Sequence, residues 1–136
     1  MAGVLVDTGP LVALIDRRDR NHDRCREASR TIRVPALTVW PVFTEAMYLL
    51  GSSWNAQDAL WEMLESGALV LASLDRVDAP RIRELMKKYR DLPMDFADAA
   101  LVRVAEREKI RRIFTLDRRG FTLYRANRIG RFSIVP

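Results

Sequence analysis

Four acidic residues occupy positions in this chain from which carboxylates can do chemistry. Asp7 and Asp117 each follow a short apolar run. Glu45 lies within a helical pattern, and Asp98 lies near the start of another. Carboxylates gathered in one place repel each other, and a hard divalent cation such as Mg²⁺ or Mn²⁺ turns that repulsion into binding. Such a cation activates water and neutralises charge on a phosphoryl group, so the four acids are candidate catalytic residues and metal ligands of a nuclease.

Each of these acids also has a purely structural interpretation. Asp7 and Asp117 can begin turns or cap the helices that follow them. Asp95 and Asp98 have the spacing of a capping box, so the structural interpretation of Asp95 is that it caps the N-terminus of a helix. Glu45 lies at the edge of an apolar stripe without Lys or Arg at helical spacing, so its charge needs another partner. A metal ion, or water held between several carboxylates, would be such a partner.

The composition excludes several other chemistries. Cys25 is the only cysteine and His22 the only histidine, which excludes an internal disulfide, a Cys/His zinc site and most histidine-based catalysis. The net charge is +5, and 23 residues are Lys or Arg, nearly all of them Arg. Arginine favours phosphate or carboxylate partners, although genomic base composition alone can also enrich it. Four arginines near Asp7 and Asp117 in the sequence could bind the phosphates of a nucleic acid such as RNA or the acidic groups of a protein partner, although such charges are more commonly solvated: Arg17, Arg18, Arg118 and Arg119.

Strand and helix patterns alternate along the chain. Strands are expected at residues 3–6, 34–37, 68–74, 113–116 and 132–135. Helices are expected at residues 8–16, 22–32, 38–50 with Thr38 as the cap, 55–66, from 75 or 78 to 90, and 95–109. This alternation is typical of an α/β domain with a parallel sheet covered on both faces, in which ligands bind at the carboxyl ends of the strands. Asp7 and Asp117 are therefore expected at that edge.

Length and hydropathy indicate the organisation and the location of the protein. The 136 residues fit one domain spanning 1–136, without repeats or a linker. The longest stretch without a charged residue is 46–57, too short for a membrane-spanning helix. No secretory signal precedes the first charge at Asp7. We therefore expect a cytoplasmic protein.

Four short motifs, in order, give the chain a resemblance to a known family. Residues 4–14 (VLVDTGPLVAL), 44–45 (TE), 95–100 (DFADAA) and 115–117 (TLD) resemble successive motifs of PIN-domain ribonucleases, especially VapC-like toxins. The resemblance spans essentially the whole chain. By position, the family's acidic site matches Asp7, Glu45, Asp98 and Asp117. Three supporting residues match as well: Thr115, the family's frequent hydroxyl residue; Asp95, an acid found in part of the family; and Thr8 in the first motif.

The resemblance implies a fold, an activity and partners. The fold would be a single PIN-like α/β domain with a largely parallel five-stranded sheet between helices. The activity would be that of a Mg²⁺- or Mn²⁺-dependent endoribonuclease that leaves 5′-phosphate and 3′-hydroxyl ends. VapC-like toxins are held inactive by a cognate antitoxin and commonly form homodimers, so RNA, an antitoxin and a second copy are the expected partners. Aromatic residues that could supply contact surfaces, or be ordinary core residues, are Trp40, Tyr48, Trp54 and Trp61.

Three other functions compete with this one. A haloacid-dehalogenase-like phosphatase needs a second acid two residues after the first, and Gly9 stands there. A phospho-accepting receiver domain needs a lysine after a late strand, whereas the three lysines lie in predicted helices or at their ends. A non-catalytic RNA- or protein-binding PIN-like module remains open. Metal-dependent RNA cleavage that one acid-to-amide change abolishes would distinguish an enzyme from that module.

Overall fold

The computed structural model describes residues 3–136, so the first two residues of the expected domain lie outside it. The strands are β1 (Val4–Val6), β2 (Ala36–Thr38), β3 (Leu69–Leu71), β4 (Arg112–Phe114) and β5 (Ser133–Val135). The helices are α1 (Thr8–Ile15), α2 (His22–Ser29), α3 (Trp40–Leu49), α4 (Trp54–Glu65), the short 3-10 helix η1 (Arg76–Asp78), α5 (Ala79–Lys88), α6 (Phe96–Glu108) and α7 (Arg118–Leu123). None of the helices in the described range is long and apolar enough to cross a membrane.

The five strands form one sheet in the order β3-β2-β1-β4-β5, and every neighbouring pair is parallel. β1 lies at the centre, with Leu5 opposite Leu37 on one side and Ile113 on the other. All three residues of β1 are buried, as expected where helices cover both faces of a sheet. The predicted α/β class is confirmed. The strand order also differs from the 2-1-3-4-5 order of receiver domains, which removes that interpretation.

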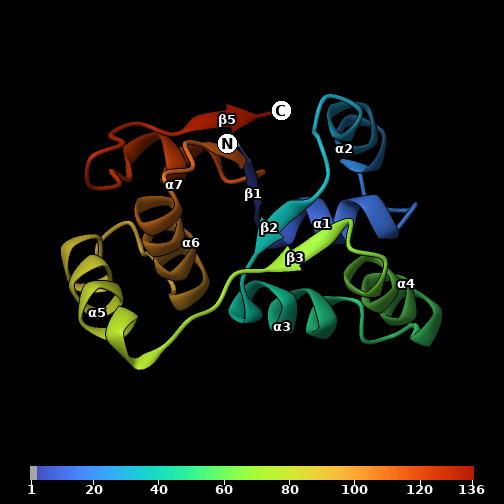
Figure 1. Ribbon diagram of the computed structural model, residues 1–136. Helices are drawn as coiled ribbons and strands as arrows, with labels where there is room; N and C mark the ends of the chain where they lie inside the picture. The colour runs from blue at the N-terminus through green and yellow to red at the C-terminus, as the bar shows by residue number, and fades with distance from the viewer. Residues whose placement is uncertain (1–2) are drawn as a thin grey trace.

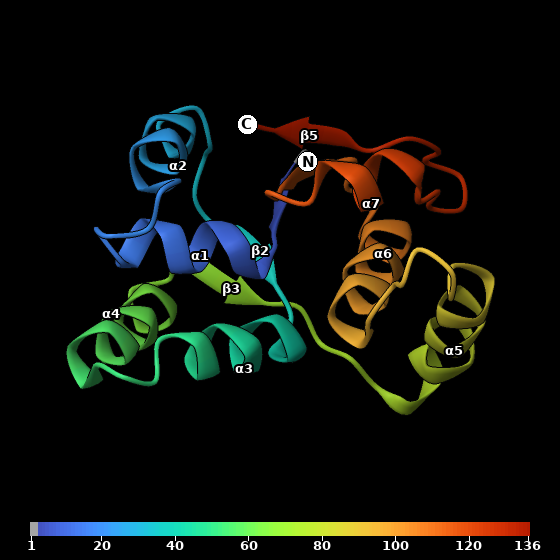
Figure 2. The same ribbon diagram turned by 180° about the vertical axis from the view of Figure 1, so that it is seen from behind.

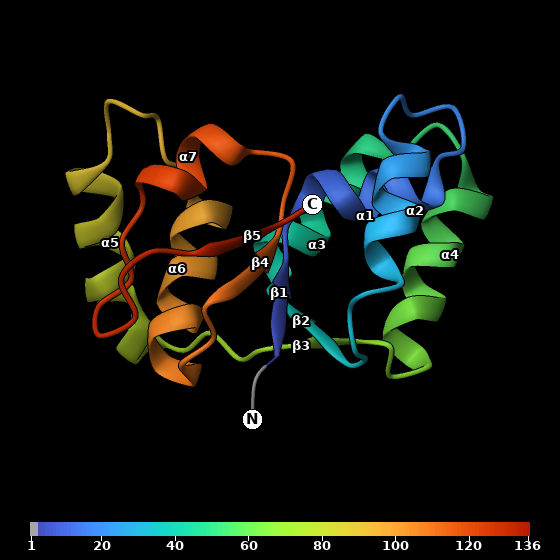
Figure 3. The ribbon, with the colours of Figure 1, turned by 90° about the horizontal axis from the view of Figure 1, so that it is seen from above.

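The helices form two groups on either side of the sheet. α1, α2 and α4 gather on one side, and α5, α6 and α7 gather on the other (Figure 1, and from behind in Figure 2). The view from above shows the strands between these two groups (Figure 3). α3 packs against both α1 and α6, so it joins the two groups. This packing brings the middle of α3 close to the starts of α1 and α6.

Two local predictions need correction. Thr38 does not cap a helix: it ends β2, and its buried hydroxyl donates a hydrogen bond to the carbonyl of Val6 at 2.8 Å. α3 instead begins at Trp40, with Pro41 in its first turn as expected. α7 was not predicted, because six residues that begin with two arginines and include Gly120 give no helical pattern of apolar residues.

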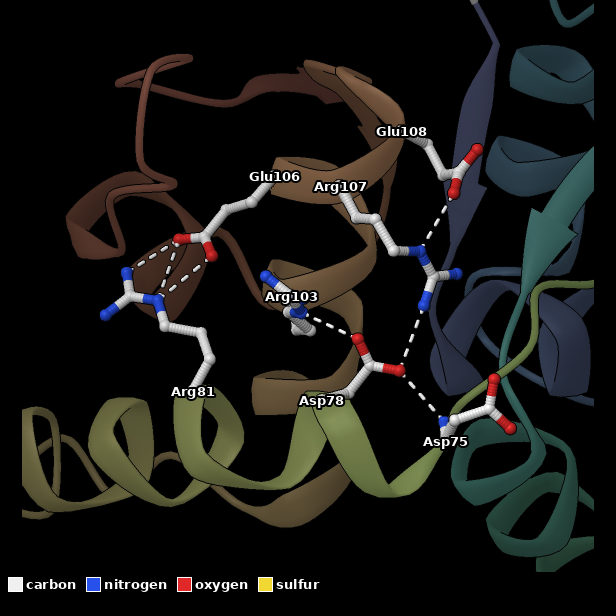
Figure 4. A network of polar contacts seen from close by, with 7 residues as sticks. All are labelled: Asp75, Asp78, Arg81, Arg103, Glu106, Arg107 and Glu108. Atoms are coloured by element: carbon white, nitrogen blue, oxygen red, sulfur yellow. Dashed lines mark hydrogen bonds and ion pairs between the residues drawn. The ribbon is translucent and has the colours of Figure 1, made fainter.

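A buried carboxylate holds η1 and α5 against α6 (Figure 4). Asp78 is fully buried and accepts hydrogen bonds from Arg103 at 2.8 Å, from Arg107 at 3.1 Å and from the backbone N–H of Asp75 at 2.9 Å. Burial alone would raise the pKa of Asp78, but the Asp75 N–H and the two guanidinium groups outweigh it and hold the pKa below its usual value. Asp78, predicted only as a possible helix start, is therefore a buried ion-pair residue.

A second ion pair joins the same two helices further along α5. Arg81 bonds Glu106 at 2.6 Å, and both side chains are largely buried. Glu106 also accepts a hydrogen bond from the backbone N–H of Asn127 at 2.8 Å. The pair therefore fastens α6 both to α5 and to the loop that precedes β5.

Candidate active site

Asp7 lies at the centre of the candidate site, directly after β1. Its backbone N–H bonds the carbonyl of Phe114 in β4 at 2.9 Å. Its side chain caps α1, accepting from the N–H of Thr8 at 2.8 Å and from the hydroxyl of Thr115 at 2.7 Å. Burial raises the pKa of Asp7 to about 6; the two hydrogen bonds lower it in part, and the charges of Glu45 and Asp117 raise it further.

Thr115 couples Asp7 to Asp117. While its hydroxyl donates to Asp7, the same oxygen accepts a hydrogen bond from the N–H of Asp117 at 3.0 Å. Asp117 does not follow the strand directly as predicted, because β4 ends at Phe114. Its side chain caps α7 by accepting from the N–H of Gly120 at 3.1 Å. A Cβ atom on Gly120 would lie 2.5 Å from Oδ2 of Asp117, so this position has no room for a side chain.

Glu45 reaches the same place from α3. Its Oε1 accepts a hydrogen bond from the hydroxyl of Thr8 at 2.7 Å. The side chain is exposed, so its position at the edge of the apolar stripe does not bury the charge in the way that the sequence pattern had led us to expect. Its other oxygen, Oε2, accepts no hydrogen bond from residues 3–136 and is free to contact a ligand.

Asp98 approaches from the first turn of α6. Asp95 and Asp98 form the predicted capping box, in which the Asp98 N–H donates to Asp95 at 2.9 Å and the Asp95 N–H donates to Asp98 at 3.4 Å. The hydroxyl of Tyr124 donates to Oδ2 of Asp98 at 3.3 Å. Burial, followed by the charges of Asp7 and Asp95, raises the pKa of Asp98 to about 8, and the charge of Asp117 adds to them. Asp98 therefore lies within electrostatic reach of both strand-end acids.

The site thus brings together carboxylates from four segments without a balancing positive charge. No ion pair within residues 3–136 involves any of them: Asp7, Glu45, Asp98 and Asp117. Among these residues, no three acidic side chains are already close enough together to hold a metal ion without moving. Oxygen donors that lie close together without a counter-charge fit a hard divalent cation, which would relieve their mutual repulsion.

Gly120 in α7 and Tyr124 directly after it, neither of them predicted from the sequence, shape this site. Tyr124 is buried, and its hydroxyl bonds Asp98; Gly120 leaves room for both that hydroxyl and Asp117. The available sequence signal was weak: Asp117 as a possible cap, followed by the apolar pair Phe121 and Tyr124 at helical spacing. A helix predicted from that signal would have led us to expect Tyr124 in the core.

The four candidate RNA-binding arginines separate into two places. Arg118 and Arg119 directly follow Asp117 at the start of α7 and are exposed. Arg17 and Arg18 do not flank the acids as expected, because they follow the far end of α1, about 12 Å along the helix from Asp7. There they line a different cavity with residues of the α3–α4 connection.

An apolar groove adjoins the acids between α3 and α6. Trp40, Tyr48 and Phe96 are exposed, and they line a cavity of about 770 Å³ together with Glu45 and Asp95. Two of the four aromatic residues named from the sequence therefore face this groove. Trp54 is exposed elsewhere, on α4. Trp61 instead packs against the core residue Phe43, with 4.9 Å between ring centroids.

The family of the chain follows from its sequence as a whole. Residues 4–128 match the sequence model of the PIN domain. The chain belongs to the PIN-domain family. This PIN domain is 33% identical to Ribonuclease VapC26 of Mycobacterium tuberculosis over 139 aligned residues, which cover 98% of this chain and 100% of that relative. The predicted resemblance to VapC-like PIN-domain ribonucleases is thereby confirmed.

Two solved structures resemble this PIN domain in fold. Mycobacterium tuberculosis VapC20, a toxin that cleaves the sarcin–ricin loop, superposes with a TM-score of 0.74 at 18% identity, covering 82% of this chain and 87% of that one. VapBC2 from Rickettsia felis, solved with a DNA fragment from its promoter, superposes with a TM-score of 0.61 at 13% identity and covers 98% of both chains. At these identities the likeness shows the shared fold.

Proposed function

We propose that this PIN domain is a Mg²⁺- or Mn²⁺-dependent endoribonuclease and the toxin of a toxin–antitoxin pair. The observation that carries the proposal is the meeting of Asp7, Glu45, Asp98 and Asp117 at the carboxyl edge of the sheet without a counter-charge. The relative at 33% identity, which is named a ribonuclease, supports RNA as the substrate. RNA is present in the cytoplasm, which we propose as the site of action.

The acids have separable roles in this proposal. Asp7, Asp98 and Asp117 would hold the cation, and Glu45 would either join them or orient the attacking water. When bound, the cation would supply Lewis-acid chemistry, lowering the pKa of water and neutralising charge on the phosphoryl group. Asp95 serves mainly as a cap, because its side chain is engaged with the N–H of Asp98.

Hydrogen bonds define what the remaining groups do. Thr8 binds Oε1 of Glu45, which leaves Oε2 as the atom that can accept a proton from the attacking water. Thr115 fixes Asp7, and Tyr124 donates to Asp98, so both carboxylates are oriented before substrate arrives. The water oxygen bonds phosphorus while the bond from phosphorus to the 3′ oxygen breaks. That oxygen takes up a proton, giving 5′-phosphate and 3′-hydroxyl ends.

The groove beside the acids suits protein partners. Trp40, Tyr48 and Phe96 leave apolar surface exposed next to Glu45 and Asp95, and such patches favour burial against another chain. We propose that a cognate antitoxin covers this groove and thereby blocks the acids. We also propose that the toxin forms a homodimer, as VapC-like proteins commonly do.

RNA cleavage by the purified protein tests the activity. We expect internal cuts in single-stranded or loop segments of a structured RNA when Mg²⁺ or Mn²⁺ is present, and none with excess chelator. The products should accept a 3′-end adapter directly and be degraded by a 5′-phosphate-dependent exonuclease. Cleavage that the chelator leaves unchanged would contradict the proposal.

We expect the metal-free protein to lose stability as pH rises from about 4 to about 8. The pKa values of Asp7 and Asp98 are raised to about 6 and about 8, so in this window the folded state keeps protons that the unfolded state has released. Folding then becomes less favourable with increasing pH. Added Mn²⁺ should restore the melting temperature at the upper end of the window, because it binds the folded state. Differential scanning calorimetry at several pH values measures both effects.

Asp7→Asn should reduce both the loss of stability with rising pH and the increase of the melting temperature by Mn²⁺. The change removes one titrating carboxylate and one proposed metal ligand. Asp91→Asn is the matched control, because Asp91 is exposed and its side chain forms no hydrogen bond or ion pair within residues 3–136. An Asp7→Asn protein with the Mn²⁺ response of the wild type would show that Asp7 is not a ligand.

A further inference from the structure

A second, basic cavity lies at the opposite edge of the sheet from the acids. Its volume is about 490 Å³. It is formed by the amino ends of β1, β4 and β5, by the segment that follows α2 and by the end of α6. Its polar lining residues are Thr31, Arg33, Lys109, Arg111, Arg112 and Ser133. We call it the basic cavity.

The fold sets the distance between the two edges. β4 begins with Arg112 in the basic cavity and leads to Asp117 in the acidic site. α6 carries Asp98 in its first turn and ends just before Lys109. At a helical rise of 1.5 Å per residue, Asp98 and Lys109 are roughly 16 Å apart along the axis. The two sites are therefore separate but belong to the same rigid elements.

The charge of the basic cavity is not neutralised by the protein. None of its four cationic residues takes part in an ion pair within residues 3–136, and no acid lines the cavity. Arg111 donates to the carbonyl of Arg131 at 2.9 Å, and Arg112 donates to the carbonyl and hydroxyl oxygens of Thr31 at 3.4 and 3.3 Å. These acceptors are uncharged. Four like charges around one hollow therefore leave a strong positive potential there.

We propose that the basic cavity binds backbone phosphates of the RNA substrate outside the segment that is cleaved. This inference rests on the proposed ribonuclease function. Guanidinium groups match phosphate oxygens in geometry, and the hydroxyl of Ser133 adds an uncharged donor. Without a bound cation the carboxylates of the active site repel phosphates, so contacts outside the active site are needed to bind the RNA. The basic cavity, about 16 Å from the acids along α6, can provide such contacts.

A double variant tests the inference with little effect on the fold. Arg33 and Lys109 are exposed, and their side chains form no hydrogen bond or ion pair within the described chain, so Arg33→Gln with Lys109→Gln removes two charges from the cavity. The matched control is Arg83→Gln with Lys87→Gln, which removes one arginine and one lysine from the exposed surface of α5. The probe is a fluorescein-labelled stem-loop RNA with single-stranded arms, and binding is followed by anisotropy in chelator, so that cleavage does not interfere.

The cavity variant should bind this RNA about tenfold more weakly than the wild type at moderate salt, as expected for the loss of two phosphate contacts. The slope of log affinity against log salt should become shallower by roughly 1 for each cation removed, while the control keeps the wild-type slope. Cleavage of an oligonucleotide too short to reach the cavity should proceed at the wild-type rate in both variants.

The outcomes separate this inference from the proposed function. If the wild type cleaves RNA and the cavity variant binds it like the control, the cavity does not hold RNA. If the wild type does not cleave RNA but the cavity variant still loses affinity and salt slope, the proposed function fails while the binding site stands. If the variant loses binding to labelled poly-L-glutamate but not to RNA, the cavity serves an acidic protein segment and the inference is overturned.

Discussion

We expect Asp98→Asn to lower metal-dependent RNA cleavage by about a hundredfold or more. Mutating a residue that only hydrogen-bonds to a metal ligand usually causes a smaller loss, about 10- to 100-fold. The side chain keeps its size and can still accept from Tyr124 and from the Asp95 N–H. The change removes a carboxylate whose charge is opposed by burial and then by Asp7 and Asp95, so the metal-free fold should be as stable as the wild type or more stable. Initial cleavage rates with Mn²⁺ and thermal unfolding without metal measure the two effects.

Asp95→Asn is the matched control for this experiment. Asparagine caps helices about as well as aspartate, so the start of α6 should be preserved. Because Asp95 mainly caps the helix, its variant should keep much more activity than Asp98→Asn. Equal cleavage by the wild type and Asp98→Asn would point to a contaminating nuclease or to another site. Equal losses in both variants would make Asp95 part of the catalytic machinery.

Asp78→Ala should lower the free energy of unfolding by about 3 kcal/mol, the lower end of the range for breaking a buried ion pair. Asp78 is fully buried, whereas Arg103 and Arg107 each keep 25% of their side-chain surface exposed. The two arginines can therefore regain water in part, which limits the loss. Urea denaturation followed by circular dichroism measures the change.

Glu108→Gln provides the comparison for Asp78→Ala. Glu108 bonds the same Arg107 at 2.9 Å but is 44% exposed, so its contribution should fall within about 0.5 kcal/mol. A loss for Asp78→Ala as small as this would mean that α5 is held to α6 by its apolar contacts and by the Arg81–Glu106 pair, with little contribution from Asp78.

The sequence predicted the parallel sheet and Asp7 at its edge because both depend on local patterns. A short apolar run followed by Asp-Thr-Gly-Pro defines where β1 ends and α1 begins. Glu45 was placed in the correct helix, but its exposure was misjudged, since the helical stripe does not show which neighbours cover it. The bonds of Tyr124 to Asp98 and of Arg103 to Asp78 join residues 26 and 25 positions apart. Such contacts depend on how helices pack, which no local pattern records.

The two threonines between the acids have an entropic consequence. Hydrogen bonds run without a break from Glu45 through Thr8 to Asp7, and on through Thr115 to Asp117. Threonine is branched at Cβ and has few allowed rotamers, so it acts as a stiff spacer in this chain of bonds. The carboxylates of Glu45 and Asp7 thus lose much of their rotational freedom when the protein folds, and Thr115 also fixes the backbone N–H of Asp117. A ligand that binds them afterwards has less side-chain entropy left to remove, so more of its interaction energy appears as affinity.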